Sequence, residues 1–155
     1  MMLREDALRL AHLAAGRPGY ALRLADDPDE ADRIIGIASD GIELLKEDTV
    51  RRFAYAASFR DIRKRGQLRE TLQIWQSLFR DLLLISSSEN NDELPISFLD
   101  LRDDLTGLAA AGSPEVFRAV LSEVNRMITY LNANANLQLL TENLLLNFPD
   151  LSGGR

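Results

Sequence analysis

The sequence predicts an all-α protein, and three observations support this. Apolar residues recur at helical spacing along nearly every segment of the 155-residue chain. Several of these segments begin at an Asp, Ser or Asn that can cap a helix N-terminus. Alternating apolar and polar residues never continue beyond about five positions, so the pattern of a half-buried strand is missing. We expect a helical bundle of about seven helices.

The first helices are bounded by proline and glycine. An amphipathic helix over 3–15 ends at Gly16, and a Pro-Gly turn begins a short helix that ends before Pro28. Asp27 and Pro28 are a typical N-cap and first-turn residue for the next helix. Its expected buried stripe is Ala31, Ile34, Ile35, Ala38, Ile42 and Leu45.

Asp48 is the expected cap of a helix that runs to Gly66, with its apolar side facing inward. That inward side consists of Val50, Phe53, Ala54 and Ala57. The segment 68–85 has the clearest amphipathic pattern in the chain. One face carries Leu68, Leu72, Trp75, Phe79 and Leu82, and the opposite face carries Arg69, Gln73, Gln76 and Arg80.

A polar loop over 86–95 separates this helix from the last third of the chain. Ser97 and Asp100 resemble a capping box, which predicts a helix that begins there and ends at Gly112. Ser113 and Pro114 then begin a helix that continues to about Leu131.

The segment LNANANLQLLTENLLLNFP (131–149) combines helix-interrupting asparagines with a leucine-rich run. Asparagine is a poor helix-interior residue and a good cap, so one helix should end near Asn132. Asn134 or Asn136 should then cap the last helix. Leucines lie on nearly all of its faces, Leu139 and Leu146 included. Such a helix is either central to the domain or partly covered by another chain.

The composition is ordinary for a soluble globular protein, with 46% hydrophobic and 27% charged residues. A net charge of −6 argues against a dedicated nucleic-acid-binding protein. The absence of cysteine excludes disulfides, thiolate metal ligands and cysteine nucleophiles. No apolar run approaches the ~20 residues that a membrane span needs. We expect a cytoplasmic protein with no membrane association.

Reactive side chains are few. The single histidine, His12, lies among alanines and leucines, where a partly exposed helix residue is expected. No Walker-type GxxxxGK[ST] run and no GxGxxG occur. The acidic clusters 26–32 and 89–93 fit helix capping and loop solubility, with a divalent metal site at 89–93 as the alternative. We therefore expect no enzyme, no catalytic residue, no resident metal and no cofactor.

A basic segment at 51–69 holds seven basic residues and a single aspartate. It is either a solvated helix face behind an aromatic core stripe, or a surface that contacts phosphates or an acidic partner. The candidate phosphate contacts are Arg51, Arg52, Arg60, Arg63, Lys64 and Arg65.

Asp81 lies at the edge of an apolar strip, beside Ile74 and Ile85, whereas its neighbour Arg80 lies on the polar face. A carboxylate in that position needs hydrogen-bond partners, because burial without them is costly. The partners lie either within the chain or on a neighbouring subunit. Candidates for structural or subunit-interface polar contacts are Arg80, Asp81, Asn132, Asn134 and Asn136.

Several of these motifs occur in an order that resembles a known family. The set consists of W-x4-R-D-L-L-L (75, 80–84), an N-x-D-E loop and LNANANLQLLTENLLLNF. It resembles the C-terminal region of the delta-prime subunit of the bacterial DNA polymerase III clamp loader. Upstream, AAGRPGYALRLA (14–25) resembles the family's G-S-P-G-R-A-L turn in the lid subdomain of the AAA+ module.

Within that turn, the matching positions are Gly16, Pro18, Gly19, Ala21 and Leu22. Arg17 replaces the usual serine, and Tyr20 replaces the arginine of the sensor-2-like position. The resemblance therefore does not extend to the residue that would sense a nucleotide.

The resemblance implies a lid remnant over 1–27, a helical collar (oligomerisation) domain over 28–149 and a disordered tail over 150–155. The chain would then be the C-terminal part of a longer protein that begins with an AAA+ nucleotide-fold domain. Its implied role is a non-catalytic scaffold in DNA replication. The implied partners are the ATPase and delta subunits of a hetero-pentamer that loads the sliding clamp, with any DNA contact indirect.

Two other functions remain open from the residues alone. A helical nucleic-acid-binding domain would use 51–69 and would show strongly salt-dependent DNA affinity. A small-molecule-binding or catalytic bundle would need a concave pocket with convergent polar groups.

Overall fold

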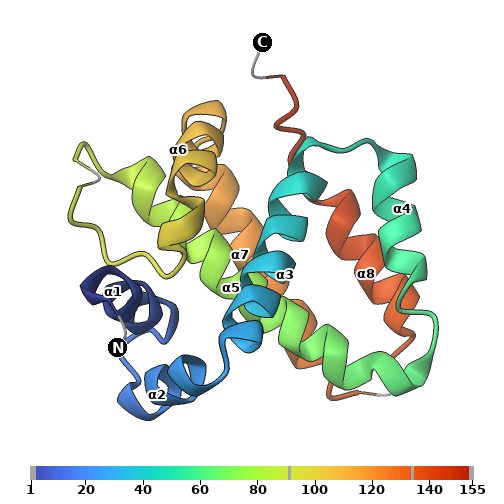
Figure 1. Ribbon diagram of the computed structural model, residues 1–155. Helices are drawn as coiled ribbons and strands as arrows, with labels where there is room; N and C mark the ends of the chain where they lie inside the picture. Colours follow the sequence, from blue (N-terminus) through green and yellow to red (C-terminus); the bar gives the residue numbers. More distant parts are fainter. Residues whose placement is uncertain (1–2, 91, 134, 154–155) are drawn as a thin grey trace.

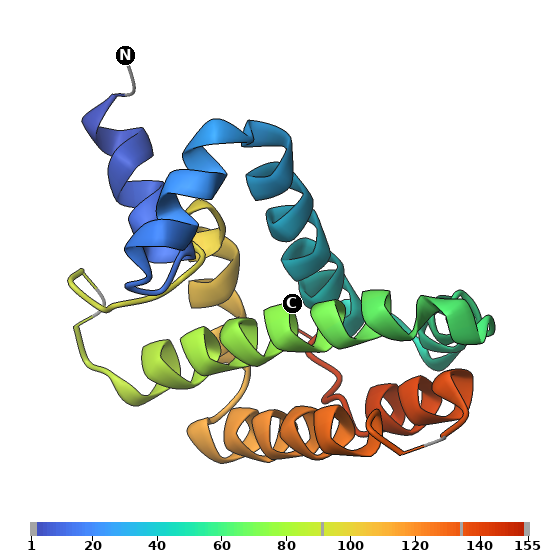
Figure 2. The same ribbon diagram turned by 90° about the horizontal axis from the view of Figure 1, so that it is seen from below.

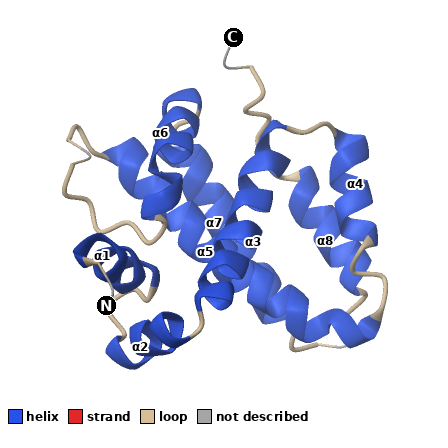
Figure 3. Ribbon diagram, viewed as in Figure 1, coloured by secondary structure: helices blue, strands red, loops and turns tan. Residues whose placement is uncertain are grey.

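The computed structural model describes residues 3–90, 92–133 and 135–153. These residues form eight α-helices and two short 3-10 helices joined by loops, and they contain no strand (Figures 1 and 3). The all-α prediction is confirmed, with one helix more than the approximate number expected.

In chain order the elements are α1 (Arg4–Leu13), α2 (Pro18–Asp26), α3 (Pro28–Lys46), α4 (Thr49–Ala57), η1 (Ile62–Lys64), α5 (Arg65–Ser87), η2 (Leu99–Leu101), α6 (Arg102–Ala111), α7 (Pro114–Tyr130) and α8 (Leu137–Leu146).

Helix α5 is the central element. It crosses the molecule with α3 on one side and with α7 and α8 on another (Figures 1 and 2). Its predicted apolar face is buried, and so is a second strip of residues beside it. That second strip consists of Thr71, Ile74, Leu78, Asp81 and Ile85. A helix covered on two sides must be apolar over a wide arc, which explains the strength of its sequence pattern.

The expected helix starts are largely confirmed. Asp27 accepts a hydrogen bond from the Glu30 amide, and Asp48 accepts one from the Arg51 amide. Ser113 caps α7 in the same way. Asn136 caps α8 by accepting from the Leu139 amide, whereas Asn134 lies outside the described residues. Each cap satisfies one amide that the first helical turn leaves without a partner.

The helix predicted over 48–66 is shorter than expected. Helix α4 ends at Ala57, where the Ser58 hydroxyl donates to the Tyr55 carbonyl and Phe59 turns into the core. Asp61 then caps η1. Gly66, expected as a helix end, lies in the first turn of α5. The core position of Phe59 therefore outweighs the local helical pattern.

The inward face predicted for α4 is also wrong. Val50 is 74% exposed, and Phe53 and Ala54 are exposed too. The buried residues of α4 are instead Arg52 and Ala56. The helix is rotated because the guanidinium of Arg52 finds four carbonyl partners in the interior, a polar contact that apolar periodicity does not register.

The capping box expected at Ser97 and Asp100 does not form. The Ser97 amide donates to Asp81, and the Asp100 carboxylate binds Arg9 of α1. The chain makes the short η2 first, and α6 begins only at Arg102. Phe98, Leu101, Leu105 and Leu108 are nevertheless buried.

Helix α8 lies at one end of the bundle, beside α4 and in contact with α7 (Figure 1). Leu139 and Leu146 are 55% and 56% exposed. The interpretation of α8 as a central core helix is therefore wrong. After α8, the Leu151 amide donates to the Leu45 carbonyl at 2.8 Å, so the tail expected to be disordered from residue 150 is attached through Leu151.

Helices α3 and α5 approach closely where Gly41 faces Trp75. The indole Nε1 of Trp75 donates to the Ile37 carbonyl at 3.0 Å, and the ring is fully buried. A Cβ on Gly41 would lie 2.8 Å from that nitrogen and 2.9 Å from Leu78 Cδ2. Gly36, also on α3, has open space around it.

We predict that Gly41→Ala destabilises the fold by about 1–3 kcal/mol, because the added methyl group overpacks a rigid aromatic contact. The matched change Gly36→Ala should stabilise it by about 0.5–1 kcal/mol, since alanine restricts the unfolded chain more than glycine does. Urea unfolding of both variants measures the difference. Equal effects of the two substitutions would contradict the α3–α5 packing described above.

Candidate functional site

Most of the ionisable and polar side chains that the sequence indicates as functional candidates make structural contacts within the chain. In 3–90, 92–133 and 135–153, no three His, Asp or Glu side chains are grouped so that they could hold a metal ion. His12 is half-buried on α1, and its Nδ1 lies 2.7 Å from the Ile96 carbonyl. That short distance indicates that Nδ1 carries the proton and donates it.

Asp81 is fully buried, and its partners are intramolecular. Its carboxylate accepts the Ser97 amide at 3.0 and 2.9 Å and the Phe98 amide at 3.0 Å. His12 and Asp81 thus hold the same short segment, Ile96 to Phe98, from α1 and from α5. Of the two interpretations of Asp81, the structure selects the contact within the chain.

Burial dominates the protonation of Asp81. Desolvation disfavours the charged carboxylate and raises its pKa to about 6, and the amides of Ser97 and Phe98 offset only part of this effect. Its neighbour Arg80 is exposed on the outer face of α5, as predicted. The positive charge of Arg80 acts in the opposite direction to burial and lowers the Asp81 pKa.

Arg52 connects the ends of three helices. Its Nε donates to the Leu44 carbonyl of α3 at 2.9 Å. Its two terminal nitrogens donate to the carbonyls of Leu145, Phe148 and Pro149 at the end of α8, at 3.2, 2.9 and 2.9 Å. Helix C-termini leave carbonyls without partners and carry partial negative charge, so a buried guanidinium suits them.

Burial lowers the pKa of Arg52 relative to a free guanidinium. Because all of its nitrogens face backbone carbonyls in the interior, Arg52 cannot contact a phosphate. Its assignment as a candidate phosphate contact is therefore wrong.

The other residues of the basic segment are spread over α4, η1 and the start of α5. Arg63 pairs with Asp61, and the Lys64 ammonium donates to the Ser58 carbonyl. Arg65 donates to the carbonyls of Leu131 and Ala133. Arg60 reaches Gln138 at 3.4 Å, and Arg51 is exposed. The break after α4 separates these charges, so they do not form one continuous helix face.

The asparagine-rich segment also makes contacts within the chain. Asn132 accepts a bond from Arg69 Nη2 at 3.3 Å, and Asn136 caps α8. With Arg65 on the neighbouring carbonyls, these contacts fix the turn from α7 to α8 against the start of α5. Asn134 is outside the described residues.

Helices α4 and α8 lie side by side at one end of the molecule (Figure 1), and several exposed apolar side chains belong to these helices. Five of the nine exposed large hydrophobic residues in the described chain belong to α4, η1 and α8. We call them the α4–α8 apolar set: Val50, Phe53, Ile62, Leu139 and Leu146. Isolated exposed leucines are normal on protein surfaces, whereas a concentration of this kind suggests a contact surface.

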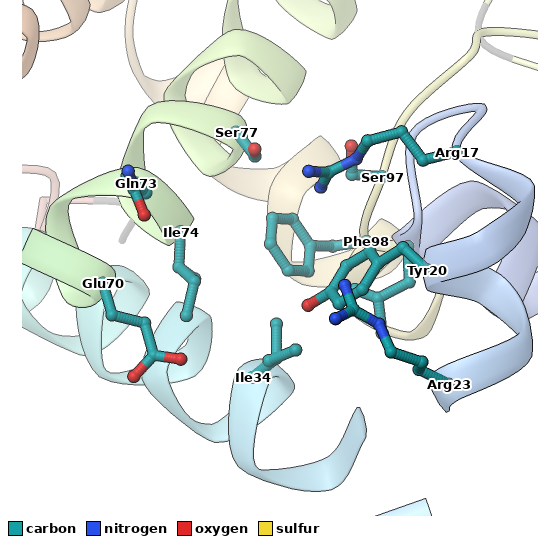
Figure 4. A pocket seen from close by; sticks show the side chains of 11 residues that line it. Arg17, Tyr20, Arg23, Ile34, Glu70, Gln73, Ile74, Ser77, Ser97 and Phe98 are labelled. Atoms are coloured by element: carbon teal, nitrogen blue, oxygen red, sulfur yellow. The ribbon is translucent and has the colours of Figure 1, made fainter. Parts of the chain in front are cut away.

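A polar cleft of about 250 Å³ lies between α2, α5 and the segment that Asp81 holds. Figure 4 shows Arg17, Tyr20 and Arg23 on one side of it and Ser77 and Gln73 of α5 on the other. Sequence reasoning missed this site. The spacing of Arg17, Tyr20 and Arg23 at three-residue intervals was the available signal, because such positions share a helix face.

Comparison with known proteins identifies no family for this chain. No model of a known protein family matches it, and no curated protein matches it with significant sequence similarity. The class that the fold defines is an all-helical bundle. Among the described residues, no helix is both long enough and apolar enough to cross a membrane.

We predict a distinctive pH dependence at Asp81. The folded state holds this proton more tightly than the unfolded chain, whose carboxyl has a pKa of 3.8. The folded state therefore binds more protons between pH 3.8 and about 6, and stability falls as pH rises through that window.

Asp81→Asn has no such titration. From about pH 4 to about pH 7, the free energy of unfolding of the wild type should fall by about 2–3 kcal/mol relative to the variant. Urea unfolding at several pH values measures this difference. A wild type that gains stability over Asp81→Asn as pH rises would contradict the assignment.

For Arg52, we predict that Arg52→Met lowers the free energy of unfolding by about 3 kcal/mol or more, because four carbonyls lose their donor. The neighbouring change Arg51→Met removes the same charge from an exposed position and should cost no more than about 0.5 kcal/mol. Thermal and urea unfolding compare the two. Similar losses in both variants would show that charge, and not the buried hydrogen bonds, explains the effect.

Proposed function

We propose that the protein is a non-catalytic interaction scaffold of the clamp-loader collar type, which assembles with sister subunits through helical faces. The observation that carries the proposal is the α4–α8 apolar set at one end of the bundle. Helix α8 lies at that end and is partly exposed, so its exposed leucines, Leu139 and Leu146, are available to another chain. Permanent interfaces between subunits resemble a divided core and are rich in such side chains.

The contacts of the buried ionisable side chains also support a non-catalytic scaffold. Asp81, Arg52 and His12 are three of the buried or half-buried ionisable groups considered for function, and all three bind backbone groups. A catalytic constellation needs ionisable groups that face one another and a substrate. These groups instead fix loops and helix ends, which suits a rigid scaffold.

The sequence motifs indicate which proteins the partners are. The order of W-x4-R-D-L-L-L, the N-x-D-E loop and the asparagine and leucine-rich end resembles the delta-prime collar region. On that resemblance, the partners are the ATPase and delta subunits of the same clamp loader, in the cytoplasm. The role is to hold the assembly that loads the sliding clamp during DNA replication.

Co-purification tests the proposal. The chain should co-purify with the ATPase and delta subunits encoded by the same genome. Leu139→Glu and Leu146→Glu each place a charge in the proposed interface, and each should weaken that association by roughly tenfold or more. Leu22→Glu is the matched control, because Leu22 is 68% exposed on α2, outside the α4–α8 apolar set, and its replacement should leave the association unchanged.

Two outcomes would reject the proposal. One is failure of the wild-type chain, verified as folded by circular dichroism, to join either subunit. The other is an equal loss of association in Leu22→Glu and in the α8 variants, which would assign the effect to charge alone.

A further inference from the structure

The cleft between α2 and α5 carries an inference that is independent of the proposed scaffold role. The Arg17 and Arg23 guanidinium carbons lie 4.7 and 5.3 Å from the centre of the Tyr20 ring. Both distances are within the range of cation–π contact. A cation–π contact uses the charge of a guanidinium and not its hydrogen-bond donors, so N–H groups remain available for other partners. Tyr20 therefore orders two cations at the same cleft (Figure 4).

Neither arginine is paired with a carboxylate in the described residues. Arg17 Nε donates to the Ala14 carbonyl at 3.2 Å, which fixes the side chain and leaves its terminal nitrogens available. The nearby carboxylates of Glu30 and Glu70 are both bound by Arg33. Arg33 thus offsets part of the negative charge that these two carboxylates place beside the cleft.

A buried hydroxyl provides an independent indication of a ligand. Ser97 is 4% exposed and lines the cleft, and its amide is bound to Asp81. Its hydroxyl makes no hydrogen bond to any described part of the chain, although buried hydroxyls normally have a partner. Ser77 on α5 adds a second hydroxyl at the opposite wall.

We propose that this cleft binds a small oxyanion, a phosphate or carboxylate group, between Arg17, Arg23 and the hydroxyls of Ser77 and Ser97. Guanidinium and hydroxyl groups donate hydrogen bonds to such oxygens, and charge-assisted bonds of this kind are the strong ones. The volume of about 250 Å³ fits a small ligand. Asp81 positions the site indirectly, because it holds the backbone of Ser97 and Phe98.

The test uses the whole chain and two probes, inorganic phosphate and acetate, added at constant ionic strength with chloride as the balancing anion. The measured signals are the Nε–Hε resonances of Arg17 and Arg23 in nitrogen-15 NMR spectra. We expect a saturable shift of both resonances with at least one probe. Saturation by phosphate or by acetate identifies which oxyanion the cleft prefers, and either result supports the proposal.

Variants give the decisive comparison. Arg17→Gln and Arg23→Gln should each weaken binding by roughly tenfold, because each removes charge-assisted donors. Arg118→Gln removes the same charge from an exposed position on α7 and should leave the affinity unchanged. Glu70→Gln should strengthen binding several-fold, since it removes a negative charge from the cleft wall and releases Arg33.

Glu70→Gln is expected to increase the affinity for the anion. This result separates a direct effect on binding from structural damage, because damage to the fold would only lower the affinity. The proposal is overturned if neither probe saturates in the wild type. It is also overturned if Arg118→Gln loses as much affinity as Arg17→Gln and Arg23→Gln. Circular dichroism melting confirms that each variant is folded.

Discussion

The packing of the Trp75 indole is the contact on which the arrangement of the helices depends. The ring is buried on the central helix, donates to α3 through the Ile37 carbonyl, and lies 5.7 Å from the Tyr55 ring of α4 and 5.6 Å from the Phe148 ring after α8. Its polar nitrogen needs a partner when it is buried, which fixes the orientation of the ring. The absence of a side chain on Gly41 makes the approach of α3 sterically feasible.

Two buried charged groups connect elements of the fold in addition to the apolar core. Asp81 connects α5 to the segment before η2, and Arg52 connects the ends of α3 and α8 through α4. Charges are costly to bury, so each is surrounded by backbone partners. Because these groups are occupied in holding the fold, the features available to other molecules lie on the surface.

Those surface features differ in chemistry and in location. The α4–α8 apolar set lies at the end of the molecule formed by α4 and α8, whereas the polar cleft lies between α2 and α5. The first suits burial against another protein, and the second suits a small anionic group. The α4–α8 apolar set and the polar cleft share no residue, so substitutions in one do not remove side chains from the other. A scaffold with an independent anion site is the combination that the two proposals together describe.

The sequence by itself determined the all-α fold, most helix boundaries and the apolar face of α5, because caps and helical spacing act within a few residues. It also indicated that Asp81 needs a partner, since a carboxylate beside Ile74 and Ile85 is costly without one. Only the tertiary structure decided that the partner is the backbone at Ser97 and Phe98, that Arg52 turns inward, and that Arg17 and Arg23 share a cleft. Contacts between residues far apart in the chain decide these features. Local spacing places Arg17 and Arg23 on one helix face, but it does not show that α5 and Ser97 form the rest of the cleft.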